Sequence, residues 1–229
     1  EGQLSEVLDA HQAAGDGKFC GIRHSIAHGD HRLGYENAPG PAPLGLAEDV
    51  RFRNGLRLLG RRGIPYDSWH HHYQMEEFIE LAQSAPDTTL IIDHFGTPVG
   101  VGRYNEQRDE VYANLNANMA KVATCPNVVA KLGGMAMPDN GFPWAESDMQ
   151  ATAEEFAEAQ RDYYLSAIDC FGPDRCMFES NFPVDRISIS YRSLFNAFKL
   201  MTADFSKTDK QALFNGTARR TYGLNPITQ

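Results

Sequence analysis

The sequence lacks three features that would each indicate a specialised class of protein. No apolar run approaches the roughly 20 residues of a membrane-spanning helix, and basic residues are in the minority, with 21 Lys and Arg against 30 Asp and Glu and a net charge of −9. Such an acidic chain is poorly suited to bind nucleic acid or an anionic membrane as its main partner. Cysteines are few, and neither a disulfide framework nor a zinc-finger spacing is visible in Cys20, Cys125, Cys170 and Cys176. Without a visible signal peptide, we expect a cytoplasmic protein with reduced thiols.

Hydrophobic patterns along the 229 residues predict one α/β domain over residues 1–229. Short apolar runs predict five strands, at 19–27, 63–69, 88–94, 127–132 and 175–181. Apolar positions at helical spacing predict helices at 4–14, 48–62, 74–85, 106–124, 149–170, 190–203 and 207–221. Strands that alternate with helices indicate βαβ units and a parallel sheet. Long loops are expected at 28–47, 95–105 and 134–148.

Two of the predicted strands end in polar side chains. The run from 88 is apolar until Asp93 and His94, and a Gly and Pro turn follows. The run from 176 carries Glu179 and Asn181 on one face, because strand side chains alternate, and a proline then prevents it from continuing. Buried polar groups are costly unless they are paired or used. Polar residues at the C-terminal ends of strands are typical of the place where a barrel carries its chemistry.

Together these strand ends resemble the amidohydrolase-related family of TIM-barrel hydrolases, which includes lactonases and related decarboxylases. The resemblance implies that His94 matches the active-site histidine of an Asp-His-x-Gly motif. It also implies that Asn181 stands where a Gly-Ser-Asp-Trp-Pro motif has the catalytic Asp. Further segments follow in the family's order, at 21–24, 66–69, 126–134, 171–175 and 215–222. Each motif is weak alone, and together they predict the family but not the substrate.

The resemblance implies a (β/α)8 TIM barrel, and the sequence predicts one that is incomplete on its N-terminal side. Closing such a barrel takes eight strands, whereas only five are predicted. The His-x-His motif of the family's first strand is not found upstream of residues 21–24, and the chain runs from Glu1 directly into a helical pattern. We therefore expect a barrel whose front strands are missing.

His94 is the leading candidate for catalysis. As a neutral imidazole it could polarise a substrate carbonyl or bind a metal ion, and either role suits attack by water on a lactone or amide. Glu179 could serve as the base, because burial would raise its pKa, or it could form a structural ion pair with Lys131. Asn181 cannot take a proton from water, but its amide could orient a water or donate to a developing oxyanion.

His24 and Lys131 are further candidates within strands. His24 ends the strand of residues 21–24, and we expect it to serve as a catalytic or metal-binding histidine, with Arg23 facing the surrounding helices in a salt bridge. Lys131 interrupts an otherwise apolar strand. Either it points inward, to pair with Glu179 or hold a substrate carboxylate, or it lies at the exposed end of its strand.

Two loop residues are candidates for substrate binding. Arg103, in the loop after His94, could hold a carboxylate by a bidentate contact. His72, the last of three consecutive histidines after Trp69, could line the same site.

The sequence therefore predicts a hydrolase that cleaves a lactone or amide bond of a small, carboxylated molecule by water attack. One zinc or manganese ion, with His94 and His24 as ligands, and a metal-free mechanism are both compatible with these residues. The rival readings are a metal-dependent decarboxylase of the same superfamily and a non-catalytic barrel fragment. A small molecule is the expected partner, and a homo-oligomer is compatible with the sequence.

Overall fold

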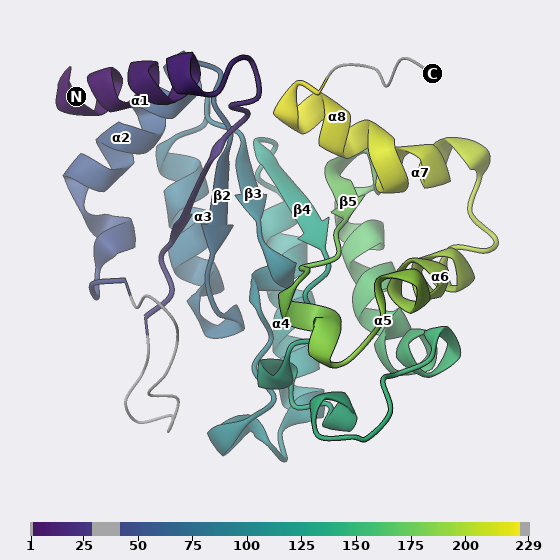
Figure 1. Cartoon of the computed structure of the whole chain (residues 1–229). Helices are drawn as coiled ribbons and strands as arrows, with labels where there is room; N and C mark the ends of the chain where they lie inside the picture. Colours follow the sequence, from purple (N-terminus) through teal and green to yellow (C-terminus); the bar gives the residue numbers. More distant parts are fainter. Residues whose placement is uncertain (1, 29–41, 225–229) are drawn as a thin grey trace.

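Five parallel strands form the centre of the molecule (Figure 1). The structure is a computed structural model that describes residues 2–28 and 42–224. Each strand is hydrogen-bonded to the next one in sequence, and every pairing is parallel. The C-terminal ends of all five therefore point to one rim, as in an α/β barrel. The strands are Ile22–Ser25 (β1), Tyr66–Trp69 (β2), Leu90–Ile92 (β3), Val128–Leu132 (β4) and Cys176–Phe178 (β5).

Helices connect the strands and pack beside the sheet (Figure 1). In that view α1 and α8 lie near the N-terminal ends of the strands, on the side away from the arrowheads. In the described part of the chain, no helix has the length and apolar character needed to cross a membrane. The helices are Gly2–Ala14 (α1), Val50–Arg61 (α2), Met75–Ser84 (α3), Arg108–Ala123 (α4), Ala153–Phe171 (α5), Tyr191–Met201 (α6), Lys207–Gln211 (α7) and Thr217–Tyr222 (α8).

The sequence around α5 explains where this helix begins and how it packs. The Thr152 hydroxyl accepts a hydrogen bond from the Glu155 backbone N–H, and the Glu155 carboxylate accepts one from the Thr152 backbone N–H. This capping box satisfies donors that the first helical turn would otherwise leave free. The helix ends at Gly172, which has a positive φ of 76°. On its buried face, the Tyr164 ring lies 6.1 Å from the ring of Phe178 in β5.

One face of the sheet is apolar and packs against helices. Leu90, Ile92 and Val128 are fully buried, and Phe178 stacks on Phe198 of α6 with ring centroids 4.5 Å apart. Burial of each such side chain contributes roughly 1.5–3 kcal/mol. This layer holds the strands in register, so residues on the opposite face and at the strand ends are held in fixed positions.

The predicted α/β class and order of elements are confirmed. The strands are shorter than predicted, and the helix expected at 207–221 is divided into α7, a π-helical turn at Ala212–Gly216 and α8. The described residues supply five strands of sheet, not the eight of a closed barrel. Residues 29–41 of the expected loop at 28–47 lie outside the described residues.

Candidate active site

The face of the sheet opposite the apolar layer carries charged side chains. Arg23 in β1 and Asp67 in β2 are register partners. Because strand side chains alternate, three more residues continue this face: Asp93 directly after β3, Lys131 in β4 and Glu179 directly after β5. Two permanent cations and three carboxylates therefore meet on one surface.

The expected orientation of β1 is wrong. Arg23, not His24, points to the charged face, where its guanidinium lies 2.9 Å from the Asp93 carboxylate. His24 faces the helices, with its ring 6.0 Å from that of Phe52 in α2. The structure therefore does not bring His24 to His94, and it gives no support to a metal site that these two histidines would share.

An ion-pair network joins the strands on the charged face. The Asp67 carboxylate accepts hydrogen bonds from Arg23 (3.0 Å), from Lys131 (2.5 Å) and from the Tyr222 hydroxyl (2.7 Å). The Lys131 ammonium also lies 3.4 Å from the Asp93 carboxylate. Lys131 thus points inward, but its direct partners are Asp67 in β2 and Asp93 directly after β3. The ion pair that the sequence suggested between Lys131 and Glu179 is replaced by this network.

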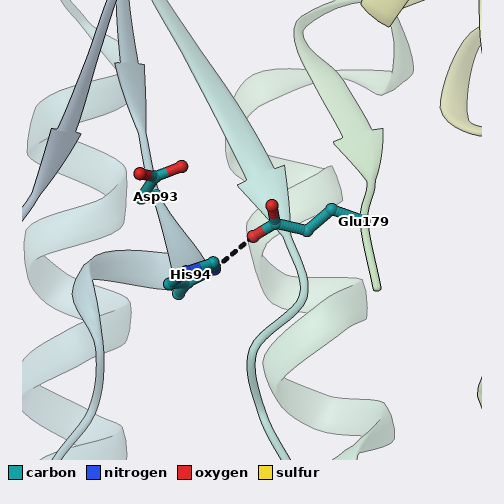
Figure 2. A group of neighbouring side chains, drawn as sticks. All are labelled: Asp93, His94 and Glu179. Atoms are coloured by element: carbon teal, nitrogen blue, oxygen red, sulfur yellow. Dashed lines mark hydrogen bonds and ion pairs between the residues drawn. The ribbon is translucent and has the colours of Figure 1, made fainter. Parts of the chain in front are cut away.

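His94 and Glu179 meet across the end of β4 (Figure 2). His94 Nδ1 and a Glu179 carboxylate oxygen form a short hydrogen bond and ion pair. Only 6% of the His94 side chain and 15% of the Glu179 side chain are exposed. The backbone at His94 and Phe95 has positive φ values of 52° and 58°. Such conformations cost about 1–3 kcal/mol each and concentrate at functional sites.

Two consecutive glycines after β4 make room for this pair. A Cβ on Gly133 would lie 2.3 Å from Cγ of Glu179, and a Cβ on Gly134 would lie 2.7 Å from the His94 ring. Gly134 also has a φ of +70°, which residues with a side chain rarely adopt. The Gly-Gly pair thus lets His94 and Glu179 approach each other over the strand end.

The charges around His94 and Glu179 shift the pKa values of both residues. Burial, the largest single influence, would lower the pKa of His94, but the charge and hydrogen bond of Glu179, together with the charge of Asp93, raise that pKa. Burial would likewise raise the pKa of Glu179, but His94, with Lys131 and Arg23, lowers it. These directions are opposite to the expected raised pKa of Glu179 and favour a charged rather than the expected neutral imidazole, because each residue supplies the opposite charge for the other. Glu179 is thereby a partner of His94 rather than a free base.

Asn181 lies beside a buried carboxylate that sequence reasoning missed. The Asn181 side-chain amide donates to Asp185, 2.8 Å away, and Asp185 is fully buried. Burial raises the pKa of Asp185 to about 7, despite the opposing hydrogen bond from Asn181. The buried Tyr164 hydroxyl has no hydrogen-bond partner among the described residues, and Asp185 and Glu179 both help to raise its pKa. The sequence signal that could have identified Asp185 is its place four positions after Asn181, in a turn that contains Pro183.

His72 and Arg103 lie elsewhere. They line a cavity of about 540 Å³ between α3 and α4, whose walls do not include His94 or Glu179. The His72 Nδ1 accepts a hydrogen bond from the Val99 backbone N–H, and the Arg103 guanidinium donates to the Tyr104 hydroxyl at 2.8 Å. The structure therefore does not bring these two residues to the His94 pair.

Asp93, His94 and Glu179 could hold a metal ion. Each offers a ligand atom within 4.8 Å of the others, and they point toward a shared space (Figure 2). One imidazole and two carboxylates suit zinc or manganese. Asp93 Oδ2 has no aligned hydrogen-bond donor among the described residues, although Arg23 Nε lies 2.9 Å away. The three ligand atoms therefore fit a divalent cation in their chemical type and in their spacing, once His94 has lost its proton.

A parallel sheet in sequence order, with ionisable side chains at the carboxyl ends of its strands, is the architecture of α/β-barrel enzymes. The chain belongs to the amidohydrolase family, whose model matches residues 5–224.

Two curated relatives and one solved protein show how far the similarity extends. The chain is 35% identical over 221 residues to the uncharacterized protein y4mH of Sinorhizobium fredii, a match that covers 96% of this chain and 65% of y4mH. It is 27% identical over 180 residues to L-fucono-1,5-lactonase of Burkholderia multivorans, which covers 78% of this chain and 58% of the lactonase. The chain thus spans less than two thirds of the length of either relative.

The fold is also that of a solved amidohydrolase from Burkholderia multivorans. Its crystal structure with bound HEPES has a TM-score of 0.77 and 24% identity, and the match covers 95% of this chain and 70% of that one. A second crystal form, with bound zinc, has a TM-score of 0.72 and 23% identity, with 94% and 70% covered.

Proposed function

We propose that this chain carries the catalytic residues of a lactone hydrolase, with His94 acting on the scissile carbonyl. The observation that carries the proposal is the buried His94–Glu179 ion pair at the ends of β3 and β5. A buried, charged imidazole on a strained strand end is costly to maintain for structure alone. It is the kind of group that stabilises charge as it develops in a reaction.

Glu179 orients His94 for this role. Because the carboxylate takes Nδ1, the Nε2 nitrogen is left for the substrate, and no described residue bonds to it. A carboxylate fixes the ring and stabilises its charged form in the same way in the Ser-His-Asp triad. Glu179 therefore acts through His94, in place of the base that the sequence suggested.

His94 would donate Nε2–H to the lactone carbonyl oxygen as water attacks the carbonyl carbon. The imidazolium stabilises the negative charge that develops on that oxygen. When the ring C–O bond breaks, the proton of the attacking water moves to the ring oxygen. One lactone and one water give one hydroxy acid, and His94 ends in its starting state. Ionisation of the product then releases a proton to solution.

The ion-pair network favours an uncharged substrate. Arg23 and Lys131 are the cations nearest this pair, and Asp67 and Asp93 already neutralise them. A substrate carboxylate would have to compete with these buried partners, so we propose a neutral lactone in place of the carboxylated molecule expected from sequence. The similarity to L-fucono-1,5-lactonase supports a sugar lactone. A decarboxylase, whose substrate is a carboxylate, is disfavoured for the same reason.

A metal ion is compatible with this site. Asp93, His94 and Glu179 would hold it, and a bound zinc or manganese would polarise the carbonyl and lower the pKa of a bound water.

Hydrolysis of L-fucono-1,5-lactone by the full-length protein tests the proposal, with proton release followed by a pH indicator. We expect turnover, and we expect His94→Gln to reduce kcat by at least about 100-fold. His72→Phe is the matched control, because His72 is a buried histidine in the turn that follows the adjacent strand, β2. Equal losses in the two variants, or no loss in His94→Gln, would refute the role of His94.

A further inference from the structure

We propose that Asp185 is a positioning residue that fixes the Asn181 amide with its oxygen toward the attacking water. The inference rests on the proposed function for its effect on rate, whereas the orientation of the amide can be tested without any substrate. Of the two roles that the sequence allowed for Asn181, it assigns the one in which the amide orients a water molecule.

The contacts of Asp185 tie it to Asn181 at both side chain and backbone. Asp185 lies in the 3₁₀ turn Val184–Ile187 and is fully buried. Asn181 Nδ2 donates to Asp185 Oδ1 at 2.8 Å, and the backbone N–H of Asp185 donates to the Asn181 carbonyl at 3.2 Å. The backbone N–H of Ala136, in the loop after β4, donates to Asp185 Oδ2 at 3.4 Å. The carboxylate is thus fixed from two separate segments.

Above about pH 7 Asp185 is ionised, and an ionised carboxylate can only accept hydrogen bonds, whereas an amide has one donating and one accepting end. Asp185 therefore binds the NH₂ end of Asn181 and turns the oxygen away from itself. No described residue donates to Asn181 Oδ1, and Asn181 is only partly buried. That oxygen is left to accept a hydrogen bond from a water molecule, and Asp185 occupies one of the two Nδ2 hydrogens.

The backbone supports the same arrangement. Asn181 has a left-handed φ of 49°, a conformation that asparagine tolerates better than most residues. The hydrogen bonds to Asp185 hold the residue in this conformation directly after the strand end that carries Glu179. Asn181 stands where the family motif has Asp, and its amide oxygen can accept a hydrogen bond as a carboxylate would. The negative charge lies instead on Asp185, which is hydrogen-bonded to Asn181.

The amide can be observed directly by NMR of ¹⁵N-labelled full-length protein, with Asn181→Ala used to assign its signals. We expect one Nδ2 proton of Asn181 to be shifted downfield and to exchange slowly, because it is bound to a carboxylate. In Asp185→Ala, which removes the acceptor, this signal should move to the range of solvent-exposed amides, whereas Asp169→Ala, a change at an exposed position on α5, should leave it in place. Asn181 signals that are the same in the protein and in Asp185→Ala would overturn the proposal.

A double-mutant cycle on L-fucono-1,5-lactone tests the effect on rate. We expect Asp185→Ala and Asn181→Ala each to lower kcat by about 10- to 100-fold, with KM changed less than about twofold. The double variant should be no slower than Asn181→Ala alone, because Asp185 acts through Asn181. Independent, multiplying losses, or a loss confined to KM, would overturn the positioning role. If the protein does not turn over this lactone but the NMR signal behaves as expected, the proposed substrate fails and the orientation of Asn181 stands.

Discussion

His72 and His94 follow adjacent strands of the same sheet and are both buried, yet the protein sets their charges in opposite directions. Burial lowers the pKa of His72 to about 4 and that of its neighbour His70 to about 3. His94 is buried as deeply, but Glu179 raises its pKa. Burial alone makes a histidine neutral, and a carboxylate from another strand reverses that effect.

Under the proposed function, this difference separates His70 and His72, as structural histidines, from the catalytic His94. The His70 ring stacks on Phe78 with centroids 4.7 Å apart, and His72 lies edge-on to Tyr104 at 5.0 Å. These rings serve as packing groups within aromatic surroundings. His94 instead lies on strained backbone, against glycines and opposite a carboxylate.

The largest effect should come from Glu179→Gln. Without the carboxylate, burial should make His94 neutral like His72, and we expect kcat on L-fucono-1,5-lactone to fall by about 100- to 1000-fold. Glu110→Gln, at an exposed position on α4, is the control and should keep kcat within about twofold. Wild-type turnover in Glu179→Gln would contradict the dependence of His94 on this partner.

Gly134→Ala should disturb His94 without changing any charged group. The added Cβ would lie 2.7 Å from the His94 ring at a φ of +70°, so we expect at least a tenfold loss of kcat. Gly45→Ala provides the matched comparison, because Gly45 has a φ of +78° and its Cβ would meet nothing within 4 Å. Both variants should lose about 1 kcal/mol of stability from backbone strain. The difference in kcat between the two variants measures the effect of the contact with His94. Equal kcat values would show that this contact does not affect the reaction.

Stability should depend on pH through Asp185. Burial raises its folded pKa from 3.8 to about 7, so the folded state binds more protons than the unfolded state between these values. The stability that this group contributes is therefore fully present below about pH 4 and is lost as pH rises through 7. Relative to the wild type, Asp185→Asn should gain stability between pH 4 and pH 8, by on the order of 1–4 kcal/mol. Denaturant unfolding at several pH values measures this, and parallel curves for the two proteins would contradict it.

The smallest effect on activity should come from His72→Phe. This change removes the acceptor of the Val99 backbone N–H, and an unsatisfied buried donor costs about 1–3 kcal/mol. We expect a lower free energy of unfolding with kcat within about twofold of wild type. Thermal melts and lactone assays on the same preparation check both parts. A large loss of kcat would place His72 in the reaction and weaken the contrast with His94.

Local patterns in the sequence were enough to predict the strands, the helices and the parallel α/β class. Strand endings also identified His94, Glu179 and Asn181, since apolar runs that stop at polar groups are visible without a structure. The orientation of β1 could not be predicted, because a one-residue change in phase exchanges Arg23 and His24 between faces. Only the partners Asp67 and Asp93, from two other strands, show which face Arg23 occupies.

The protonation of the site was beyond sequence reasoning for a related reason. Whether burial or a partner controls the pKa of Glu179 depends on its distance from His94, 85 positions away in the chain. The same holds for Lys131, whose partners Asp67 and Asp93 lie on two different strands. Asp185 could not be predicted as a site residue, because a carboxylate in a turn is normally expected to be exposed.

Titration of the histidine ring signals by NMR tests the central claim most directly. In the full-length protein, we expect His94 to remain protonated above pH 6.5, the ordinary value for histidine, while His70 and His72 stay neutral down to about pH 4. In Glu179→Gln, the His94 titration should move below 6.5, toward the behaviour of the other two. If His94 titrates below 6.5 in the wild type, or if its titration is the same in Glu179→Gln, then Glu179 does not set the charge of His94 and the account fails.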